Sequence, residues 1–390
     1  MNMRLTFRTV GATNEVFKRL CCLRRWTHFV TEDKYNELAK QSLNCITAFF
    51  LATCAEHEGK TIIWERFPKI AIYRAFQKTY VYFDTPEFIL KDICRVGKIE
   101  ADIFDQTTRQ IIAEQTDDAF ADFICEGIGT YEAQIYKAAT KLATFIELLE
   151  NERKMNGDFI HKYHEIIETL KEYEDIPMVK ELSTNPEHHM FKVIQHLSQL
   201  RNQNRWAVNV YNMECSVLGH LFDTAVFAYY MSLEQDMENE KLATRMFFMG
   251  IFHDVAESWT KDIPSPIKDR VKGFRKATEE YENKMIKEHM YDVLPQYVSD
   301  TLKKVMFEED GNQEFHALIK GADYLSADSE CWRQYKAGSR DEYFRNATLR
   351  RKNRIEAGKE VLTPACRELF EYFVCLLYTS PSPRDTERSR

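Results

Sequence analysis

The sequence has no apolar run long enough to cross a membrane. A membrane-spanning helix needs about 20 consecutive apolar residues, whereas the longest run here, Ile46–Ala52, has only the length of a core segment. The sequence also lacks an excess of positive charge, because its 390 residues carry a formal net charge of −8. These absences exclude a membrane channel and disfavour broad electrostatic binding of a nucleic acid polymer. A small anionic substrate remains open if a metal ion or a few cations supply positive charge locally.

The ten cysteines include no CxxC pair, which excludes a zinc ribbon. A chain of this length does not need disulfide bonds to hold its core together. Free thiols fit a reducing compartment, and we therefore expect a cytoplasmic protein. The composition, 44% hydrophobic and 29% charged, is typical of a globular chain and not of a disordered one.

Glycine (13 residues) and proline (10 residues) are sparse, and strand-like alternation of apolar and polar residues is rare. Apolar residues instead recur at helical spacing. The sequence therefore predicts an all-α fold. Two stretches show the spacing most clearly: Ile135, Ala138, Ala139, Leu142 and Phe145, and then Leu221, Ala225, Val226 and Tyr229.

An acidic stretch from Glu172 to Pro186 contains two prolines and is the best candidate domain boundary. It predicts two helical domains, residues 1–180 and 181–374, which share four segments in the same order and thus indicate an ancient duplication. On this interpretation the basic N-terminus belongs to an opening helix and is not a targeting peptide. The matched segments are Phe17-Lys18 with Phe191-Lys192, Arg25-Trp26 with Arg205-Trp206, Asp84-Thr85-Pro86 with Asp262-Ile263-Pro264, and residues 137–143 with 320–326.

The C-terminal residues 375–390 differ in character from the rest. Residues 375–385 look like one translated frame of a transposase-based sequencing adapter, and the alternative is a flexible Ser/Pro tail. We expect an artefact without function, so that the native protein would continue past Val374 in another way.

Polar side chains interrupt three apolar helical segments in the second half of the chain. His253 and Asp254 follow the run Phe248–Phe252, while His220 and Asp323 interrupt two other apolar helices. Burying such groups costs several kcal/mol (roughly 2–7 for an unpaired polar group) unless they are paired or bound to a metal. Two imidazoles and two carboxylates form a mixed N/O ligand set suited to Mn, Co, Fe, Mg or Zn. The alternative is that each buried histidine is a hydrogen-bonded core residue.

The ordered set of motifs from His196 to Lys268, with Asp323 beyond, resembles the HD-domain superfamily of metal phosphohydrolases, and within it the YfbR-type 5'-deoxynucleotidases. The motifs that carry the resemblance are Arg205-Trp206, Gly219-His220, His253-Asp254 followed by Glu257, Asp262 to Lys268, and Lys320 to Asp323. The resemblance covers about Asn185 to the end of the native chain and implies an HD-domain helical bundle.

The resemblance implies that one divalent metal ion, Co, Mn or similar, is bound by His220, His253, Asp254 and Asp323. It further implies that Glu257 acts as the acid/base and that Arg205 orients the phosphate. Trp206 would pack on the sugar and exclude a 2'-hydroxyl, and the loop that starts at Asp262 would hold the 3'-hydroxyl. The substrate-binding set expected in this way is Arg205, Trp206, His220, Asp262, Ile263, Pro264, Ser265 and Asp323.

This region has a second interpretation and one departure from the family pattern. Arg205 and Trp206 could instead form an interfacial cation–π pair, and the prolines could merely stiffen a turn. The family usually places a glutamate directly before the first metal histidine, whereas Gly219 stands there in this chain. That departure removes no metal ligand.

The first half lacks the expected ligands. Ala75 and Phe76 align with His253 and Asp254, Thr79 aligns with Glu257 and Thr140 with Asp323, while Gln41 or Ser42 lies near the place of His220. We therefore interpret residues 1–180 as a degenerate HD-like copy with a structural, dimer-mimicking or regulatory role. The alternative is an unrelated helical domain with a chance repeat.

The leading hypothesis is a cytoplasmic, metal-dependent phosphohydrolase that acts on deoxynucleoside 5'-monophosphates. Its expected partner is this small-molecule deoxynucleotide, and we expect it to bind neither a nucleic acid polymer nor a membrane. One alternative is a deoxynucleoside triphosphate triphosphohydrolase that uses the same site. Another is a nucleotide-binding regulatory protein in which the N-terminal copy senses and the second site is slow. The chain could form a homo-oligomer, or the fused copy could act as an internal pseudo-dimer.

Overall fold

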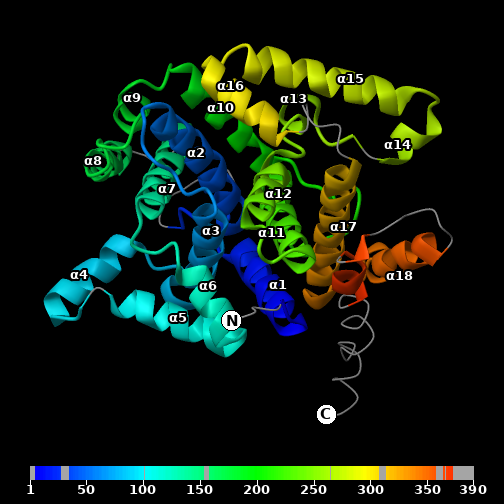
Figure 1. The fold of residues 1–390 in the computed structure, drawn as a ribbon, viewed down its shortest axis with the longest axis horizontal. Coiled ribbons are helices and arrows are strands. Elements are labelled where there is room, and N and C mark those ends of the chain that lie inside the picture. Colours follow the sequence, from blue (N-terminus) through cyan, green and yellow to red (C-terminus); the bar gives the residue numbers. More distant parts are fainter. Residues whose placement is uncertain are drawn as a thin grey trace.

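The computed structural model describes residues 5–27, 35–100, 102–152, 158–263, 265–306, 313–356, 363–364 and 366–371. Helices provide its regular structure, as the sequence predicts (Figure 1). Within those ranges no strand forms, and only two isolated antiparallel bridges occur, Arg24 with Asn36 and Asn204 with Ser216. The predicted all-α fold is therefore confirmed. The tail at residues 375–390 lies outside the described residues.

The first half of the chain carries ten of the helical elements. They are α1 (Phe7–Cys22), α2 (Glu37–His57), α3 (Arg66–Gln77), the π-helix η1 (Lys78–Tyr82), α4 (Glu87–Gly97), α5 (Ile103–Gln115), α6 (Asp118–Cys125), α7 (Tyr131–Glu150), α8 (Asp158–Lys171) and α9 (Val179–Thr184).

The second half begins at α10, so that the predicted cut at residue 180 falls inside the short helix α9. Its elements are α10 (His189–Ser198), the 3₁₀ helix η2 (Gln199–Asn202), α11 (Val217–Gln235), α12 (Glu240–Phe252), α13 (Glu257–Thr260), α14 (Ser265–Arg270), α15 (Phe274–Ile286), the π-helix η3 (Lys287–Tyr291), α16 (Gln296–Val305), α17 (Gln313–Lys336) and α18 (Glu342–Glu356).

Helices α2 and α11 form the centre of the molecule and pack on each other. Both are buried along nearly their whole length, and apolar residues make up most of α11 and of α2 from Cys45 on. Each begins at a capping side chain: Asn36 accepts a hydrogen bond from the Ala39 amide, and Ser216 accepts one from the Gly219 amide. Around them, α7 packs on α2, while α12 and α17 pack on α11. This arrangement fixes α11, α12 and α17 relative to one another.

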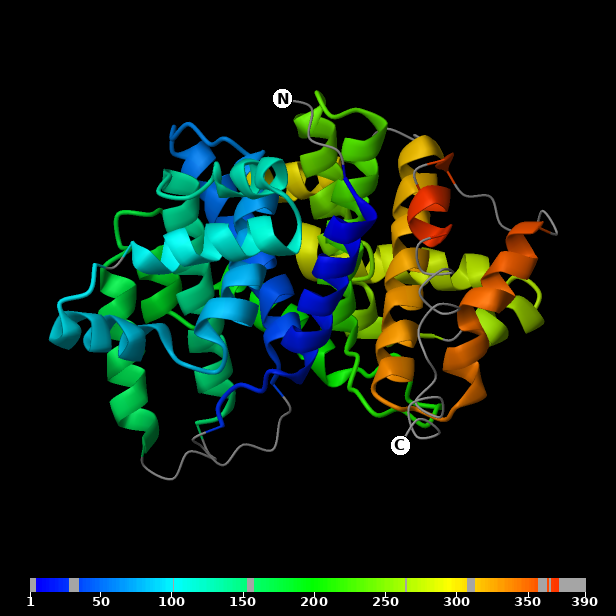
Figure 2. The same ribbon diagram turned by 90° about the horizontal axis from the view of Figure 1, so that it is seen from below.

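Helix α1 belongs to the first half in sequence but contacts the second half in space (Figure 2). The Phe17 ring lies edge-on to Phe222 and Phe227, with centroids 5.9 and 5.8 Å away. The Thr13 hydroxyl lies 2.9 Å from the Tyr230 hydroxyl. The core therefore runs continuously through both halves. Within the described residues, no helix is both long and apolar enough to span a membrane.

Candidate active site

The four predicted metal ligands converge from three helical segments. His220 lies on α11, His253 and Asp254 directly follow α12, and Asp323 lies on α17. His220 Nε2 is 3.3 Å from Asp323 Oδ1 and 4.0 Å from Asp254 Oδ2. His253 Nε2 is 3.1 Å from the same Asp254 oxygen. Ligand atoms of His220, His253 and Asp323 all lie within 4.8 Å of one another.

Both imidazole rings are held through Nδ1, which leaves Nε2 facing the carboxylates. His253 Nδ1 lies 2.7 Å from the Gly250 carbonyl oxygen, and its buried Nε2 faces the Asp254 carboxylate 3.1 Å away. His220 Nδ1 lies 2.7 Å from Ser326 Oγ. Outer partners of this kind orient metal-binding histidines. Two ring nitrogens that face carboxylates in this way fit a divalent metal ion with N/O ligands.

The charged groups around Asp254 and Asp323 favour the ionised form of both carboxyl groups. Burial alone would raise the pKa of the Asp254 carboxyl, but the adjacent His253 ring outweighs burial and holds that pKa below its ordinary range. The pKa of Asp323 is likewise lowered, against burial, by Lys320 and His220. Both carboxylates are thus ready to coordinate a cation.

Glu330 is a buried residue of this site that the motifs did not single out. Its side chain is 1% exposed, and Oε2 accepts hydrogen bonds from Arg205 Nε at 3.1 Å and Trp206 Nε1 at 2.9 Å. Its other oxygen lies 3.2 Å from His220 Nδ1. Burial opposes its ionisation, but Arg205 and His220 lower the pKa of Glu330 to about 2. The signal in the sequence is its place on α17, two helical turns after Asp323 and therefore on the same face.

Arg205 and Trp206 are both anchored by Glu330, beside the candidate metal ligands. The Arg205 guanidinium also lies 3.9 Å from Asp323 Oδ1. The Trp206 ring packs against Tyr343 and Phe344, with centroids 5.5 and 5.6 Å away. The guanidinium lies 6.0 Å from the Trp206 ring centre, so the cation–π contact exists alongside the shorter contacts with Glu330.

Glu257 begins α13 and is buried close to the ligands. Its Oε2 makes no hydrogen bond among the described residues. Burial and the neighbouring carboxylates of Asp254 and Asp262 raise the pKa of Glu257 well above its ordinary value. Gln203 links this segment to the next loop, because its Nε2 donates to the Glu257 carbonyl at 2.9 Å and its Oε1 accepts from the Asp262 amide at 3.3 Å. Asp262 thus lies beside the site.

The remaining predicted residues of this loop are placed only in part. Ile263 is half-buried. Ser265 begins α14, which places its backbone directly after the loop. Pro264 lies outside the described residues. The predicted contact of the loop with a sugar hydroxyl stays a prediction.

Gly219, the departure from the family pattern, lies against the other half of the chain. A Cβ atom at this position would be 3.4 Å from both Leu38 Cγ and Cδ2 of α2. A methyl group would fit at that distance, but a longer glutamate side chain would have to displace Leu38. The glycine therefore allows α2 to pack closely on α11 beside His220.

A His-Asp pair at the end of one helix, joined by a histidine and an aspartate from two others, forms a candidate HD-type metal site on an all-α fold. Residues 192–374 match the model of the 5'-deoxynucleotidase YfbR-like family. This part of the chain is therefore a YfbR-like HD domain, and the predicted relationship is confirmed for it.

Curated proteins similar to this chain carry the same family name. The 5'-deoxynucleotidase YfbR of Shigella boydii is 28% identical over 173 residues, which are 42% of this chain and 80% of that protein. The 5'-deoxynucleotidase Ent638_2835 of Enterobacter sp. is 27% identical over 187 residues, 46% of this chain and 86% of that protein. YfbR of Escherichia coli O1:K1 is 28% identical over 173 residues, which are 42% of this chain and 80% of that protein. The similarity thus spans most of each relative and under half of this chain.

Proposed function

We propose that this protein is a metal-dependent phosphohydrolase that removes the 5'-phosphate from deoxynucleoside 5'-monophosphates. The observation that carries the proposal is the convergence of His220, His253, Asp254 and Asp323 next to the Arg205 guanidinium. Relatives named 5'-deoxynucleotidase over the same residues support the substrate class.

The metal ligands, Arg205 and Glu257 each have a separate role in the proposed reaction. A divalent cation held by the four ligands would activate water and neutralise phosphate charge. Arg205, fixed through its Nε by Glu330, keeps its remaining N–H groups available for phosphate oxygens, which guanidinium groups bind in a bidentate manner. Glu257 has a buried oxygen without a hydrogen bond and can hold or move a proton at the reacting phosphate ester.

Selection of the deoxy sugar is assigned to Trp206 and the loop from Asp262 to Ser265. The Trp206 indole is held at both ends, by Glu330 at Nε1 and by Tyr343 and Phe344 along the ring. A ring held in this way cannot move aside for an extra hydroxyl. It therefore supports discrimination against a 2'-hydroxyl.

Phosphate release from a panel of deoxy and ribo 5'-monophosphates, with Mn, Co, Mg or a chelator, tests the proposal. We expect metal-dependent release from the deoxy nucleotides. His253→Ala should abolish it while the helical circular dichroism signal stays close to that of the wild type. Unchanged turnover in that variant, or no release from any monophosphate, would contradict the assignment. Chromatography of products from a triphosphate separates the alternative activity, since that reaction would yield triphosphate and nucleoside.

The oligomeric state and the cytoplasmic location stay predictions.

A further inference from the structure

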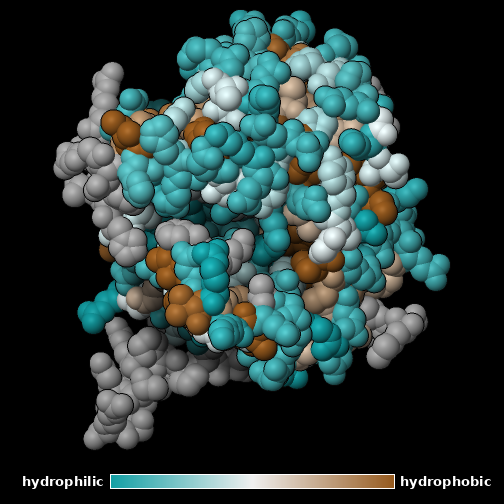
Figure 3. All heavy atoms as spheres, turned by 90° about the vertical axis from the view of Figure 1, so that its left-hand side faces the viewer, coloured by the Kyte–Doolittle hydropathy of each residue, from teal (hydrophilic) through white to brown (hydrophobic). Residues whose placement is uncertain are grey.

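A cavity lies in the N-terminal half, lined by none of the HD-site residues. Its volume is about 290 Å³, near the lower end of the roughly 300–1,000 Å³ of small-molecule sites. Helices α2, α3, α7 and α8, the π-helix η1 and residues 84–87 line it. Figure 3 shows the face of the molecule that carries α4 and α8, where a hollow is surrounded by mostly hydrophilic side chains.

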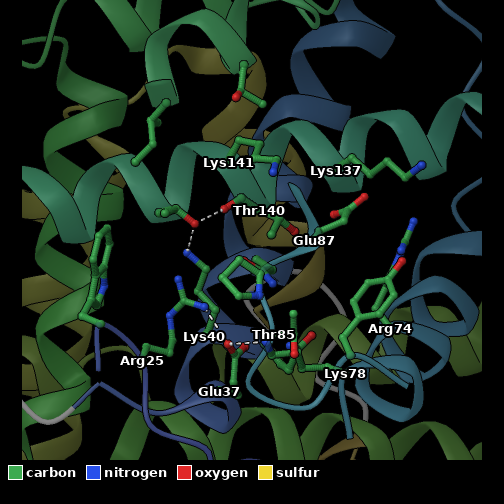
Figure 4. A pocket seen from close by; sticks show the side chains of 18 of the residues that line it. Arg25, Glu37, Lys40, Arg74, Lys78, Thr85, Glu87, Lys137, Thr140 and Lys141 are labelled. Atoms are coloured by element: carbon green, nitrogen blue, oxygen red, sulfur yellow. Dashed lines mark hydrogen bonds and ion pairs between the residues drawn. The ribbon is translucent and has the colours of Figure 1, made fainter. Parts of the chain in front are cut away.

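Positive charge prevails in this cavity. Eight of its lining residues are Lys or Arg and four are Asp or Glu. Lys137 and Lys141 project from α7, while Arg25 and Lys78 lie across the cavity from them (Figure 4). This excess is notable in a chain with a net charge of −8. The full set of lining cations is Arg24, Arg25, Lys40, Arg74, Lys78, Lys137, Lys141 and Lys162.

The innermost cations share too few carboxylates. Arg25 contacts Glu37 at 2.7 Å and Glu147 at 2.9 Å. Lys78 reaches the same Glu37 oxygen at 3.5 Å, and Lys40 lies 3.6 Å from Glu147. Arg25, Lys78 and the Lys40 amine thus share two carboxylates, so that an anion entering the cavity would balance the charge of Lys40 in its protonated form.

The contacts of this cluster repeat those of the metal site. Arg25 Nε and Trp26 Nε1 donate to Glu147 at 3.0 and 2.9 Å, as Arg205 and Trp206 donate to Glu330. Lys40 follows Arg25 by the same fifteen residues that separate His220 from Arg205. Its Nζ takes the place beside Glu147 that the His220 ring takes beside Glu330.

Lysine side chains line the cavity at positions that correspond to the candidate metal ligands of the HD site. Thr140, aligned with Asp323, lines it, and at the junction of α3 and η1 the lining residues are Gln77 and Lys78. Ala75 and Phe76, the residues aligned with His253 and Asp254, are instead buried in the core. No histidine occurs among the described residues that line the cavity. The site therefore offers cations in place of metal-binding groups.

We propose that this cavity binds a phosphate monoester of mononucleotide size or smaller, without a metal ion and without hydrolysing it. Lys40, Lys78 and Lys141 face the phosphate, and Arg25 keeps the position that Arg205 has at the HD site. The role of the N-terminal half is thus to bind a phosphorylated ligand as well as to pack on the catalytic half. This inference does not depend on the substrate of the HD site.

Two further observations fit such a ligand. Burial, opposed by Glu147 and reinforced by Arg25, lowers the pKa of Lys40 to about 7, and a bound dianion would raise that pKa and hold the amine charged. The Asn44 side chain is 2% exposed and lines the cavity, yet its Oδ1 has no hydrogen-bond partner in the described structure. A hydroxyl or amino group on the organic part of the ligand would satisfy it.

Calorimetric titration of the full-length His253→Ala variant in a chelator tests this inference. The probes are deoxyadenosine 5'-monophosphate, inorganic phosphate and deoxyadenosine. We expect the monophosphate to bind and the nucleoside, which has no phosphate, to bind at least about tenfold more weakly, because charge-assisted hydrogen bonds are lost. Adding Lys78→Gln or Lys141→Gln should weaken binding of the monophosphate by about tenfold or more.

A lysine outside the cavity provides the matched control. Lys276 on α15 has a side chain that is 83% exposed, and Lys276→Gln should bind the monophosphate like the parent variant. The monophosphate should also raise the melting temperature of the parent and not of Lys78→Gln. Absence of binding, or equal binding in all three lysine variants, would overturn the inference. Residual phosphate release by the His253→Ala parent would instead count against the proposed function of the HD site.

Discussion

Replacing Glu330 by glutamine tests whether one buried carboxylate organises the HD site. Glu330 is a positioning residue: one oxygen accepts from Arg205 and Trp206, and the other lies beside His220 Nδ1. Glutamine preserves the shape but removes the charge. If its oxygen stays with Arg205 and Trp206, its NH₂ group turns toward His220 and cannot accept the Nδ1 proton.

The expected magnitude follows from those contacts. Hydrogen bonds to charged groups contribute about 1.5–3 kcal/mol, and breaking a buried ion pair costs about 3–5 kcal/mol. Because glutamine retains an acceptor, we expect the free energy of unfolding to fall by about 2–3 kcal/mol. Loss of an outer partner of a metal-binding histidine should reduce metal affinity or activity by about 10–100-fold.

The assay combines a metal titration of phosphate release with urea unfolding of the same variant. Glu147→Gln is the matched control, since Glu147 holds Arg25, Trp26 and Lys40 in the N-terminal half without any metal ligand nearby. It should lose stability to a similar degree while its affinity for metal stays unchanged. Equal losses of metal affinity in both variants, or no loss in Glu330→Gln, would refute the reasoning.

Three other perturbations follow from the geometry. Asp223→Asn leaves the buried Arg333 without its charged partner, and urea unfolding should show a loss of about 3–5 kcal/mol. Gly250→Ala would place a Cβ atom 2.5 Å from Ala225 Cα; the helices must separate, so we expect a loss of about 1–3 kcal/mol or more and reduced phosphate release, because His253 follows on the same segment. The Lys40 amine, its pKa lowered by burial to about 7, binds its proton more weakly in the folded than in the unfolded chain. Between about pH 7 and pH 10 it therefore makes stability rise with pH, and melting curves should show this rise in the wild type relative to Lys40→Met.

The sequence was informative wherever a residue type conflicted with its surroundings. His220, His253, Asp254 and Asp323 each interrupt an apolar segment, and the structure brings these side chains together. Helical periodicity gave the fold class because apolar residues recur at a single spacing through most of the chain. Both inferences rest on local patterns that tertiary packing did not override.

Glu330 and the N-terminal cavity depended on information that local patterns do not hold. A glutamate among polar neighbours on α17 looks like a solvated residue until Arg205, 125 positions earlier in sequence, is placed beside it. The sequence alignment of the two halves also did not indicate that Gln77 and Lys78 line the cavity while Ala75 and Phe76 are buried. A π-helix begins at Lys78 and changes the number of residues per turn from that point on, which α-helical spacing in the sequence does not predict.

The contacts of α1 with the second half determine whether that half can be expressed as a separate fragment. Besides Phe17 and Thr13, Asn14 hydrogen-bonds Ser329 and Cys21 Sγ donates to the Glu214 carbonyl, so that this helix covers the catalytic half from outside its own sequence region. An expression fragment starting near residue 181 would expose Phe222, Phe227 and the buried face of α11 to water. We expect such a fragment to aggregate, and to be rescued by co-expression of the first 180 residues. The second half would then depend on the first for its fold even where the two are made as separate chains, because α1 covers part of its core.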